Sequence, residues 1–154
     1  SAASDVYKRQ VAALAECSGP LVVISADTAI SMMAVNAKQE LVGGVILPGP
    51  QLSLSALVKN TAQLPQIDLA AKAPASILGK STSSCLQNGF VLGTASLLDG
   101  LAERFCAELG PQTAFYATGN LPIPIREACC TPILYRETLI TDGLYRIWMK
   151  NKKG

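Results

Sequence analysis

The sequence predicts an α/β fold in which helices pack on the faces of a mixed sheet. Three short apolar runs, rich in β-branched residues, follow one another within residues 21–47, and such runs are typical of buried strands. Apolar residues then recur at helical spacing within residues 83–109. Further strand-like runs follow that stretch, so strands and helices interleave along the chain as they do in α/β domains.

The first three predicted strands form an antiparallel unit with two tight connections. They span residues 21–26, 29–35 and 41–47. Gly43 and Gly44 lie inside the third run, where missing side chains indicate a bulge or a close approach of backbone or ligand. The tip between the first two strands carries a polar cluster where a phosphate can sit: Ser25, Asp27, Thr28 and Ser31.

The rest of the chain predicts helices alternating with two more strands. A helix end at residues 11–16 precedes the strands, and a helix begins near Pro50, which suits a first turn. After a loop to about Lys80, a long helix carries the apolar stripe Leu97, Leu101, Phe105 and Leu109. Residues 113–117 and 133–135 predict strands, and residues 141–150 a terminal helix. The order is therefore βββ-α-α-β-α-β-α.

A second stripe on the long helix consists of small residues: Gly89, Gly93, Ser96 and Gly100. Small residues at this spacing let another backbone approach closely. The backbone that approaches this stripe can belong either to the domain's own sheet or to a second subunit.

Composition indicates one globular domain and excludes several classes of function. The 154 residues are 49% hydrophobic and 16% charged, with a net charge of +2. So small a net charge does not indicate a basic surface that would bind nucleic acid or an anionic membrane. No apolar run approaches the ~18 residues of a membrane helix. The absence of a signal-peptide pattern favours the cytoplasm.

The chain contains five cysteines and no histidine. The odd number and the absence of a CxxC motif argue against a disulfide framework and a zinc site. Catalysis by Ser-His-Asp or Cys-His is excluded, so acid–base chemistry falls to carboxylates or lysines. The adjacent Cys129 and Cys130 are either a redox-active pair or, as we expect, partly buried small apolar residues.

Residues 1–10, SAASDVYKRQ, resemble a translated transposase-end adapter used in preparing DNA sequencing libraries. We therefore predict that they are foreign and that the natural protein resumes near Val11; the alternative is an ordinary N-terminal segment. Residues 11–154 are then a single domain.

Short motifs from about Val11 to Asn151 resemble those of type III pantothenate kinases, within the acetate and sugar kinase/heat-shock/actin superfamily. The sequence has SADTA at residues 25–29 where the family has D-x-G-T-A, and residues 43–49 match GGxIxPG. Residues 61–65 match TAxLP, Gly79 and Thr82 fit G-x-x-T, and Thr118-Gly119-Asn120 stands where TGG is usual. Residues 142–151 resemble the closing GL…N. The resemblance implies a ribonuclease H-like, actin-like ATPase domain.

The resemblance also implies roles for individual residues. Ser25 takes the position of an Asp that helps to hold a monovalent cation, K⁺ or NH₄⁺. Thr28 would contact ATP phosphate, Asp27 and Gly119 would also belong to the ATP-binding site, and Thr61 would contact pantothenate. Asp27 replaces a Gly that permits close phosphate approach. Plain structural roles remain open as well: Thr28 as a turn-capping hydroxyl and Thr61 as a helix-end hydroxyl.

Two family motifs are absent from the sequence. The D-x-G-N-T phosphate motif has no counterpart, and the G-x-D-R segment that bears the family's catalytic base would fall on residues 3–6. There Asp5 is followed by Val6 instead of Arg, and we assign Asp5 no role. Phosphoryl transfer needs its base, metal and phosphate loops together, so we predict no catalytic residue in this chain and no activity of the chain alone.

The expected function is therefore that of the C-terminal, ATP-facing and dimer-forming half of a type III pantothenate kinase. By resemblance the whole enzyme uses ATP, Mg²⁺ and a monovalent cation to phosphorylate pantothenate, the first step towards coenzyme A. A second hypothesis is a diverged, non-catalytic regulator or binding protein, which the departures at Ser25, Asp27 and Asn120 favour. A third, a sugar kinase or chaperone-like ATPase, is disfavoured by the TAxLP and GGxIxPG motifs.

Overall fold

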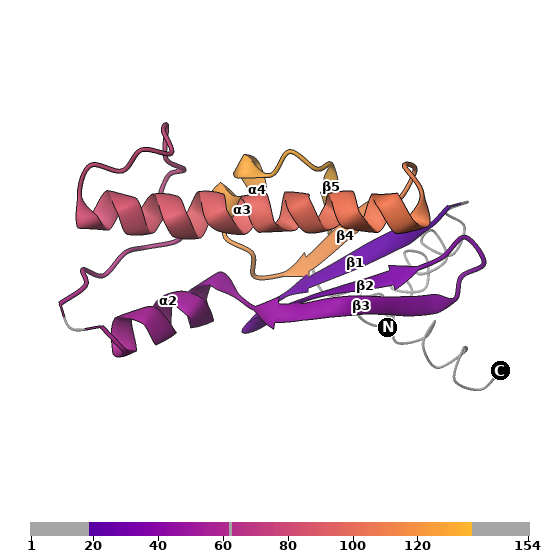
Figure 1. The fold of residues 1–154 in the computed structure, drawn as a ribbon, viewed down its shortest axis with the longest axis horizontal. Coiled ribbons are helices and arrows are strands. Elements are labelled where there is room, and N and C mark those ends of the chain that lie inside the picture. The colour runs from indigo at the N-terminus through magenta and orange to yellow at the C-terminus, as the bar shows by residue number, and fades with distance from the viewer. Residues whose placement is uncertain (1–18, 62, 137–154) are drawn as a thin grey trace, which may run out of the picture.

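The computed structural model describes residues 19–61 and 63–136. The expected helices at residues 11–16 and 141–150 lie outside these ranges, as do residues 1–10. Figure 1 shows a sheet with one long helix along its face. The described elements are β1 (Leu21–Ala26), β2 (Ala29–Val35), β3 (Leu41–Pro48), α2 (Pro50–Lys59), α3 (Thr82–Leu109), β4 (Ala114–Gly119), α4 (Ile123–Ala128) and β5 (Ile133–Tyr135).

The five strands form one mixed sheet in the order β3-β2-β1-β4-β5. β1 pairs antiparallel with β2, β2 pairs antiparallel with β3, and β1, β4 and β5 run parallel. The predicted element order as far as β5 and the antiparallel β1-β2-β3 unit are confirmed, with strand ends within two residues of the expected ones. Since β1 lies at the centre of the sheet, its side chains are buried on both faces, as its continuous apolar run predicts.

The main core lies between the sheet and α3. Alternate residues of β1, Val22 and Ile24, join a cluster with Val91 and Leu98 of α3, whereas Leu21 and Val23 belong to a smaller cluster on the other face. This alternation follows from the two-residue period of a strand.

The buried face of α3 differs from the predicted apolar stripe. The residues of α3 that are buried are Asn88, Val91, Ala95, Leu98 and Ala102. Leu97 is 40% exposed, and Leu101, Phe105 and Leu109 only flank the core. The predicted stripe is thus rotated by about one residue, because the true core face includes two alanines and an asparagine, which a search for large apolar residues passes over.

The small-residue stripe of α3 does not pack on the sheet. Gly89, Gly93, Ser96 and Gly100 are all exposed, and a Cβ placed at any of the three glycines would meet nothing within 4 Å. Of the two alternatives left open, packing of this stripe on the domain's own sheet is therefore wrong. A subunit contact stays a prediction.

The glycine pair in β3 has the predicted structural cause. The register between β2 and β3 shifts at Ala34/Val35, opposite the residues around Gly43, and Gly43 has a φ of 138°. A Cβ on Gly44 would overlap the carbonyl oxygen of Met32 on the neighbouring strand. These glycines therefore serve a bulge and a close backbone approach.

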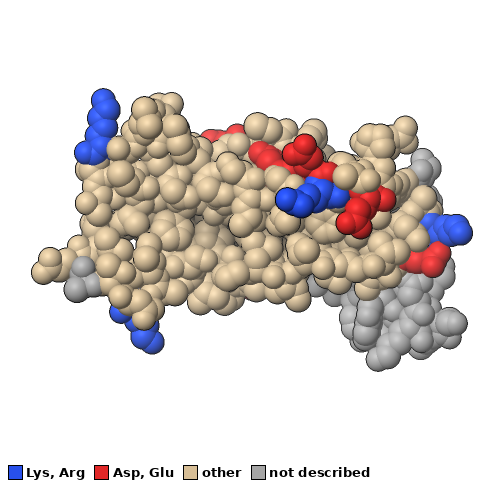
Figure 2. Space-filling model, viewed as in Figure 1, with Lys and Arg blue, Asp and Glu red and all other residues tan. Residues whose placement is uncertain are grey.

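Charge is sparse over much of the surface. On the face shown in Figure 2, charged side chains gather over the C-terminal part of α3, whose first charged residue is Asp99. No helix in the described ranges is both long and apolar enough to cross a membrane.

Candidate functional site

Three polar side chains follow the ends of the three parallel strands. Asp27 comes after β1, Asn120 after β4 and Arg136 after β5. The Asn120 N–H donates to the Ala26 carbonyl at 2.7 Å, and the Arg136 N–H donates to the Ala117 carbonyl at 2.7 Å. The carboxyl edge of a parallel sheet is the usual ligand-binding edge of α/β proteins, so this edge is the candidate site.

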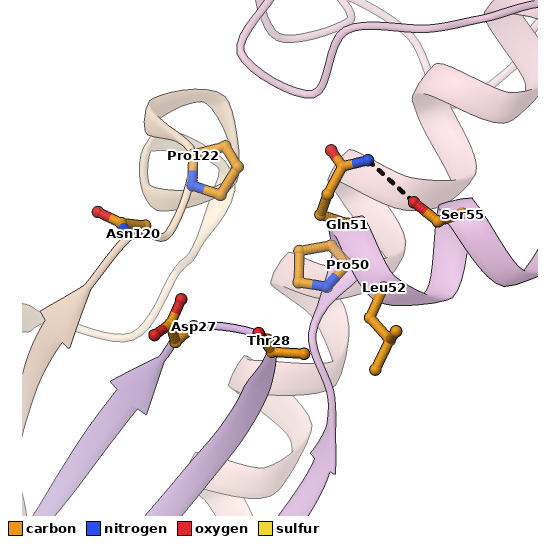
Figure 3. Close-up of a pocket in the computed structure, with 8 residues that line it drawn as sticks. All are labelled: Asp27, Thr28, Pro50, Gln51, Leu52, Ser55, Asn120 and Pro122. Atoms are coloured by element: carbon orange, nitrogen blue, oxygen red, sulfur yellow. Dashed lines mark hydrogen bonds between the residues drawn. The ribbon is translucent and has the colours of Figure 1, made fainter.

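A first cavity of about 440 Å³ opens between this edge and the beginning of α2 (Figure 3). Asp27 and Thr28 line it at the β1–β2 turn, and Gln51 lines it from the first turn of α2. In Figure 3, Pro122 faces Pro50 across the opening. No side chain caps the N-terminus of α2, so backbone N–H groups of its first turn remain available to an anion.

A second, larger cavity of about 800 Å³ adjoins the first, because Asp27 and Asn120 line both. Its walls come from the ends of β1, β4 and β5 and from α4. The lining residues are Ser25, Ala26, Asp27, Ala117, Thr118, Gly119, Asn120, Arg126, Tyr135 and Arg136. The structure thus brings Ser25, Asp27 and Gly119 to one cavity and Thr28 to its neighbour.

Two glycines let the backbone segments around the site approach one another. Gly119 has a φ of 95°, and a Cβ there would overlap the Ala26 carbonyl oxygen. Gly49 packs against the β1–β2 turn, where its N–H donates to the Thr28 carbonyl at 2.8 Å, and a Cβ would lie 2.5 Å from the Asp27 carbonyl oxygen. The glycines of the TGN and GGVILPG motifs therefore set the spacing of the strand ends.

Asp99 of α3 holds the loop that precedes β5. Its carboxylate accepts hydrogen bonds from the backbone N–H groups of Cys130 (2.8 Å) and Thr131 (2.9 Å) and from the Thr131 hydroxyl (2.7 Å). Burial acts to raise the pKa of Asp99, but these hydrogen bonds outweigh it and the pKa lies below the usual value. Asp99 thereby fixes the position from which β5 carries Tyr135 into the second cavity.

Two groups near this loop stay protonated at neutral pH. Burial raises the pKa of Cys129 to about 11, and the nearby Asp99 carboxylate adds to the effect. Burial also raises the pKa of Tyr135 to about 12. A thiol with so little thiolate is a poor nucleophile, which favours the packing role for Cys129, while Cys130 is exposed.

Thr61 lies apart from the other candidate residues. It is exposed just beyond the end of α2 and lines neither cavity. Because an α-helix rises roughly 1.5 Å per residue, the end of α2 near Thr61 lies about 13 Å along the helix axis from Pro50. The substrate-contacting role of Thr61 stays a prediction.

Sequence reasoning missed several residues that line the cavities, among them Gln51, Arg126, Tyr135 and Arg136. Arg136 carried a usable signal, since it directly follows a predicted strand. The position of Arg126 depends on tertiary packing, because α4 contacts α3 and the Arg126 guanidinium lies 4.6 Å from the centre of the Tyr135 ring. No sequence pattern indicates that contact.

The residues at the edge fit a nucleotide better than a metal bound by protein alone. Within residues 19–61 and 63–136, no three His, Cys, Asp or Glu side chains gather into a metal-binding group. Mg²⁺ in phosphoryl-transfer sites commonly takes one or two carboxylates and completes its shell with substrate phosphates and water. Asp27 can supply such a carboxylate, and the Ser25 hydroxyl offers a neutral oxygen to a monovalent cation.

Comparisons with known proteins identify the family to which this chain is similar. The family profile described as "Type III pantothenate kinase" matches residues 4–104. A type III pantothenate kinase of Koribacter versatilis is 37% identical over 152 residues, 98% of this chain and 54% of that protein. Another from Solibacter usitatus is 35% identical over 141 residues, 92% of this chain and 53% of that protein. The chain thus spans about half the length of the curated relatives it matches.

A solved structure supports the fold alone. The crystal structure of a conserved protein from Campylobacter jejuni, described as a Baf family transcriptional activator, has a TM-score of 0.56 and 20% sequence identity; the match covers 96% of this chain and 65% of that one. The expected α/β, ribonuclease H-like (actin-like) fold class is confirmed. On the sequence match over most of its length, the chain belongs to the type III pantothenate kinase family.

Proposed function

We propose that this chain is the ATP-facing half of an enzyme that transfers the γ-phosphoryl group of ATP to pantothenate, the first step towards coenzyme A. Thr28, Asp27 and Gly119 would lie against the nucleotide, Ser25 beside a monovalent cation, K⁺ or NH₄⁺, and Thr61 against pantothenate. Mg²⁺ would neutralise charge on the transferring phosphoryl group when bound. The whole protein would act in the cytoplasm as a homodimer, with the exposed small stripe of α3 available for subunit contact.

One observation carries the proposal: the β1–β2 turn and the uncapped N-terminus of α2 face one cavity. Thr28 and Gln51 line it from these two elements. Anions are stabilised at helix N-termini by the free N–H groups and the helix dipole, and a hydroxyl beside turn amides forms a plausible phosphate nest. This is the arrangement that the terminal phosphates of ATP require.

The chain alone is expected to bind ATP without turning it over. It lacks a second phosphate loop and a credible base, and such groups act as a unit. With ATP, Mg²⁺ and pantothenate, formation of 4′-phosphopantothenate should not exceed that of a control without protein. Fusing the chain to the N-terminal half of the Koribacter versatilis enzyme should restore turnover. Clear turnover by the chain alone would show that the missing motifs are dispensable.

The departures at Ser25, Asp27 and Asn120 favour a second candidate, a non-catalytic regulator or binding protein. All three residues line the second cavity, so the three departures from the family motifs fall in one site. The fused enzyme separates the two candidates. If it is inactive as it stands but gains turnover when all three residues are restored with Ser25→Asp, Asp27→Gly and Asn120→Gly, this chain has lost catalysis by divergence. If it is active without restoration, the kinase is supported.

Asp27 is expected to weaken nucleotide binding through its charge. It lines both cavities, and two like charges ~4 Å apart repel appreciably even after partial screening by solvent and Mg²⁺. Asp27→Asn, which keeps the shape and removes the charge, should tighten ATP binding roughly fivefold, which is about 1 kcal/mol. Asp27→Gly should do at least as much. Calorimetric titration of the fused enzyme with ATP measures both.

A competing role for Asp27 is to supply the cation-binding carboxylate that Ser25 lacks. The two residues, two positions apart, line the same cavity. In that case Asp27→Asn would weaken ATP binding and reduce its dependence on K⁺. Repeating the titration with and without K⁺ distinguishes the roles, and a weaker, K⁺-independent Asn variant would contradict the repulsion described above.

A further inference from the structure

We propose that Arg126 and Arg136 form an anion-binding subsite in the second cavity, which takes the polyphosphate chain of a nucleotide. The proposal rests on the proposed function, since it assumes that a nucleotide occupies the carboxyl edge of the sheet. It adds two phosphate-binding residues that lie outside the motifs by which the family resemblance is carried.

Both guanidinium groups are anchored on Tyr135. The Arg126 guanidinium stacks over the Tyr135 ring, 4.6 Å from its centre, and its Nε donates to the Leu121 carbonyl at 2.7 Å. A terminal nitrogen of Arg136 donates to the Tyr135 carbonyl at 3.1 Å. Each of these two hydrogen bonds uses one of the five N–H groups of an arginine side chain. The remaining donors of each guanidinium group are therefore available to a ligand.

The charge in this cavity favours an anion. Among the described residues, those that line it include two arginines and one carboxylate, Asp27. Where the chain is described, no carboxylate pairs with either guanidinium. A guanidinium fork matches phosphate oxygens in a bidentate manner, so an approaching phosphate would satisfy both groups and offset its repulsion by Asp27.

Tyr135 forms part of the wall behind the two arginines. Its side chain lines the cavity, while its hydroxyl oxygen is buried and has no hydrogen-bond partner among the described residues. Burial raises the pKa of this hydroxyl to about 12, so Tyr135 adds no negative charge to the cavity at neutral pH.

The connection between the cavities favours a polyphosphate over a single carboxylate. Asp27 and Asn120 line both cavities, so one extended ligand can reach from the arginine forks to Thr28 and the beginning of α2. A nucleotide carries anionic groups in a row and fits this path. A small monocarboxylate would occupy only one end.

The test is calorimetric titration of the 154-residue chain with sodium tripolyphosphate, ATP and adenosine. Arg136→Gln should weaken the binding of tripolyphosphate and of ATP about tenfold, as expected for loss of a charge-assisted hydrogen bond. The affinity for adenosine should not change. Arg126→Lys keeps the charge but loses the forked donors of the guanidinium group, so it should weaken the binding of both anions by a smaller factor. Arg104→Gln is the matched control, since Arg104 lies on α3 and lines a different cavity; its affinities and melting temperature should equal those of the parent chain.

Four outcomes decide the matter. Three of them would overturn the subsite. The parent chain fails to bind tripolyphosphate; the Arg136→Gln and Arg104→Gln variants bind it with equal affinity; or Arg136→Gln weakens the binding of adenosine and not that of the anions. Arginine-dependent tripolyphosphate binding supports it. The fused enzyme keeps this result separate from the proposed function: arginine-dependent binding without pantothenate phosphorylation leaves the subsite standing and removes the kinase proposal.

Discussion

Replacing Gly119 with alanine is expected to cost at least about 3 kcal/mol of folding free energy. Gly119 has a φ of 95°, and an added Cβ would overlap the backbone carbonyl of Ala26. Neither backbone segment can move freely, because β1 and β4 pair along their whole length. Denaturant unfolding of the variant should show a much lower midpoint, or the protein should fail to fold.

Gly93→Ala is the matched control for Gly119→Ala. Gly93 lies within α3, and a Cβ there would meet nothing within 4 Å. Alanine in a helix interior is favoured over glycine by roughly 0.5–1 kcal/mol, so this variant should be slightly more stable than the parent. If both substitutions destabilise the chain equally, steric overlap at Gly119 is not the cause.

Leu98→Ala is expected to destabilise the domain by about 2–5 kcal/mol. Leu98 is 1% exposed and belongs to the main core with residues of β1. Removing its branched end would leave a cavity between α3 and the sheet, which a close-packed core fills only partly. The same denaturant measurement checks this effect.

Leu97→Ala tests which face of α3 is buried. Leu97 is chemically identical and adjacent, but it is 40% exposed, so its loss should cost less than about 1 kcal/mol. A greater cost for Leu97→Ala than for Leu98→Ala would restore the stripe of Leu97, Leu101, Phe105 and Leu109 as the core face.

The strands could be predicted because each is marked locally. β1 is a short apolar run that ends at Asp27, and the turn between β2 and β3 carries Asn36, whose side-chain oxygen accepts from the N–H groups of Lys38 and Glu40. The family motifs mark the same β1–β2 tip. Period-2 burial and turn chemistry therefore suffice to predict the antiparallel unit.

The arginine side of the site could not be predicted for a physical reason. Arg126 meets Tyr135 because the loop between α4 and β5 is held by Asp99, which lies more than thirty positions before Thr131. Such contacts depend on tertiary packing and leave no periodic signal. The same is true of the face of α3, where Ala95 and Ala102 are buried for their small size.

The central position of β1 also constrains the order of folding. On one side β1 pairs with β2, its immediate neighbour in sequence, whereas on the other Leu21 pairs with Ala114, some ninety positions later. Local hairpins form in microseconds, while a parallel pairing across so long a loop carries a large closure entropy. The β1-β2-β3 meander is therefore free to form first. The edge of β1 that pairs with β4 stays exposed until α3 has packed across the sheet, because α3 connects the meander to β4.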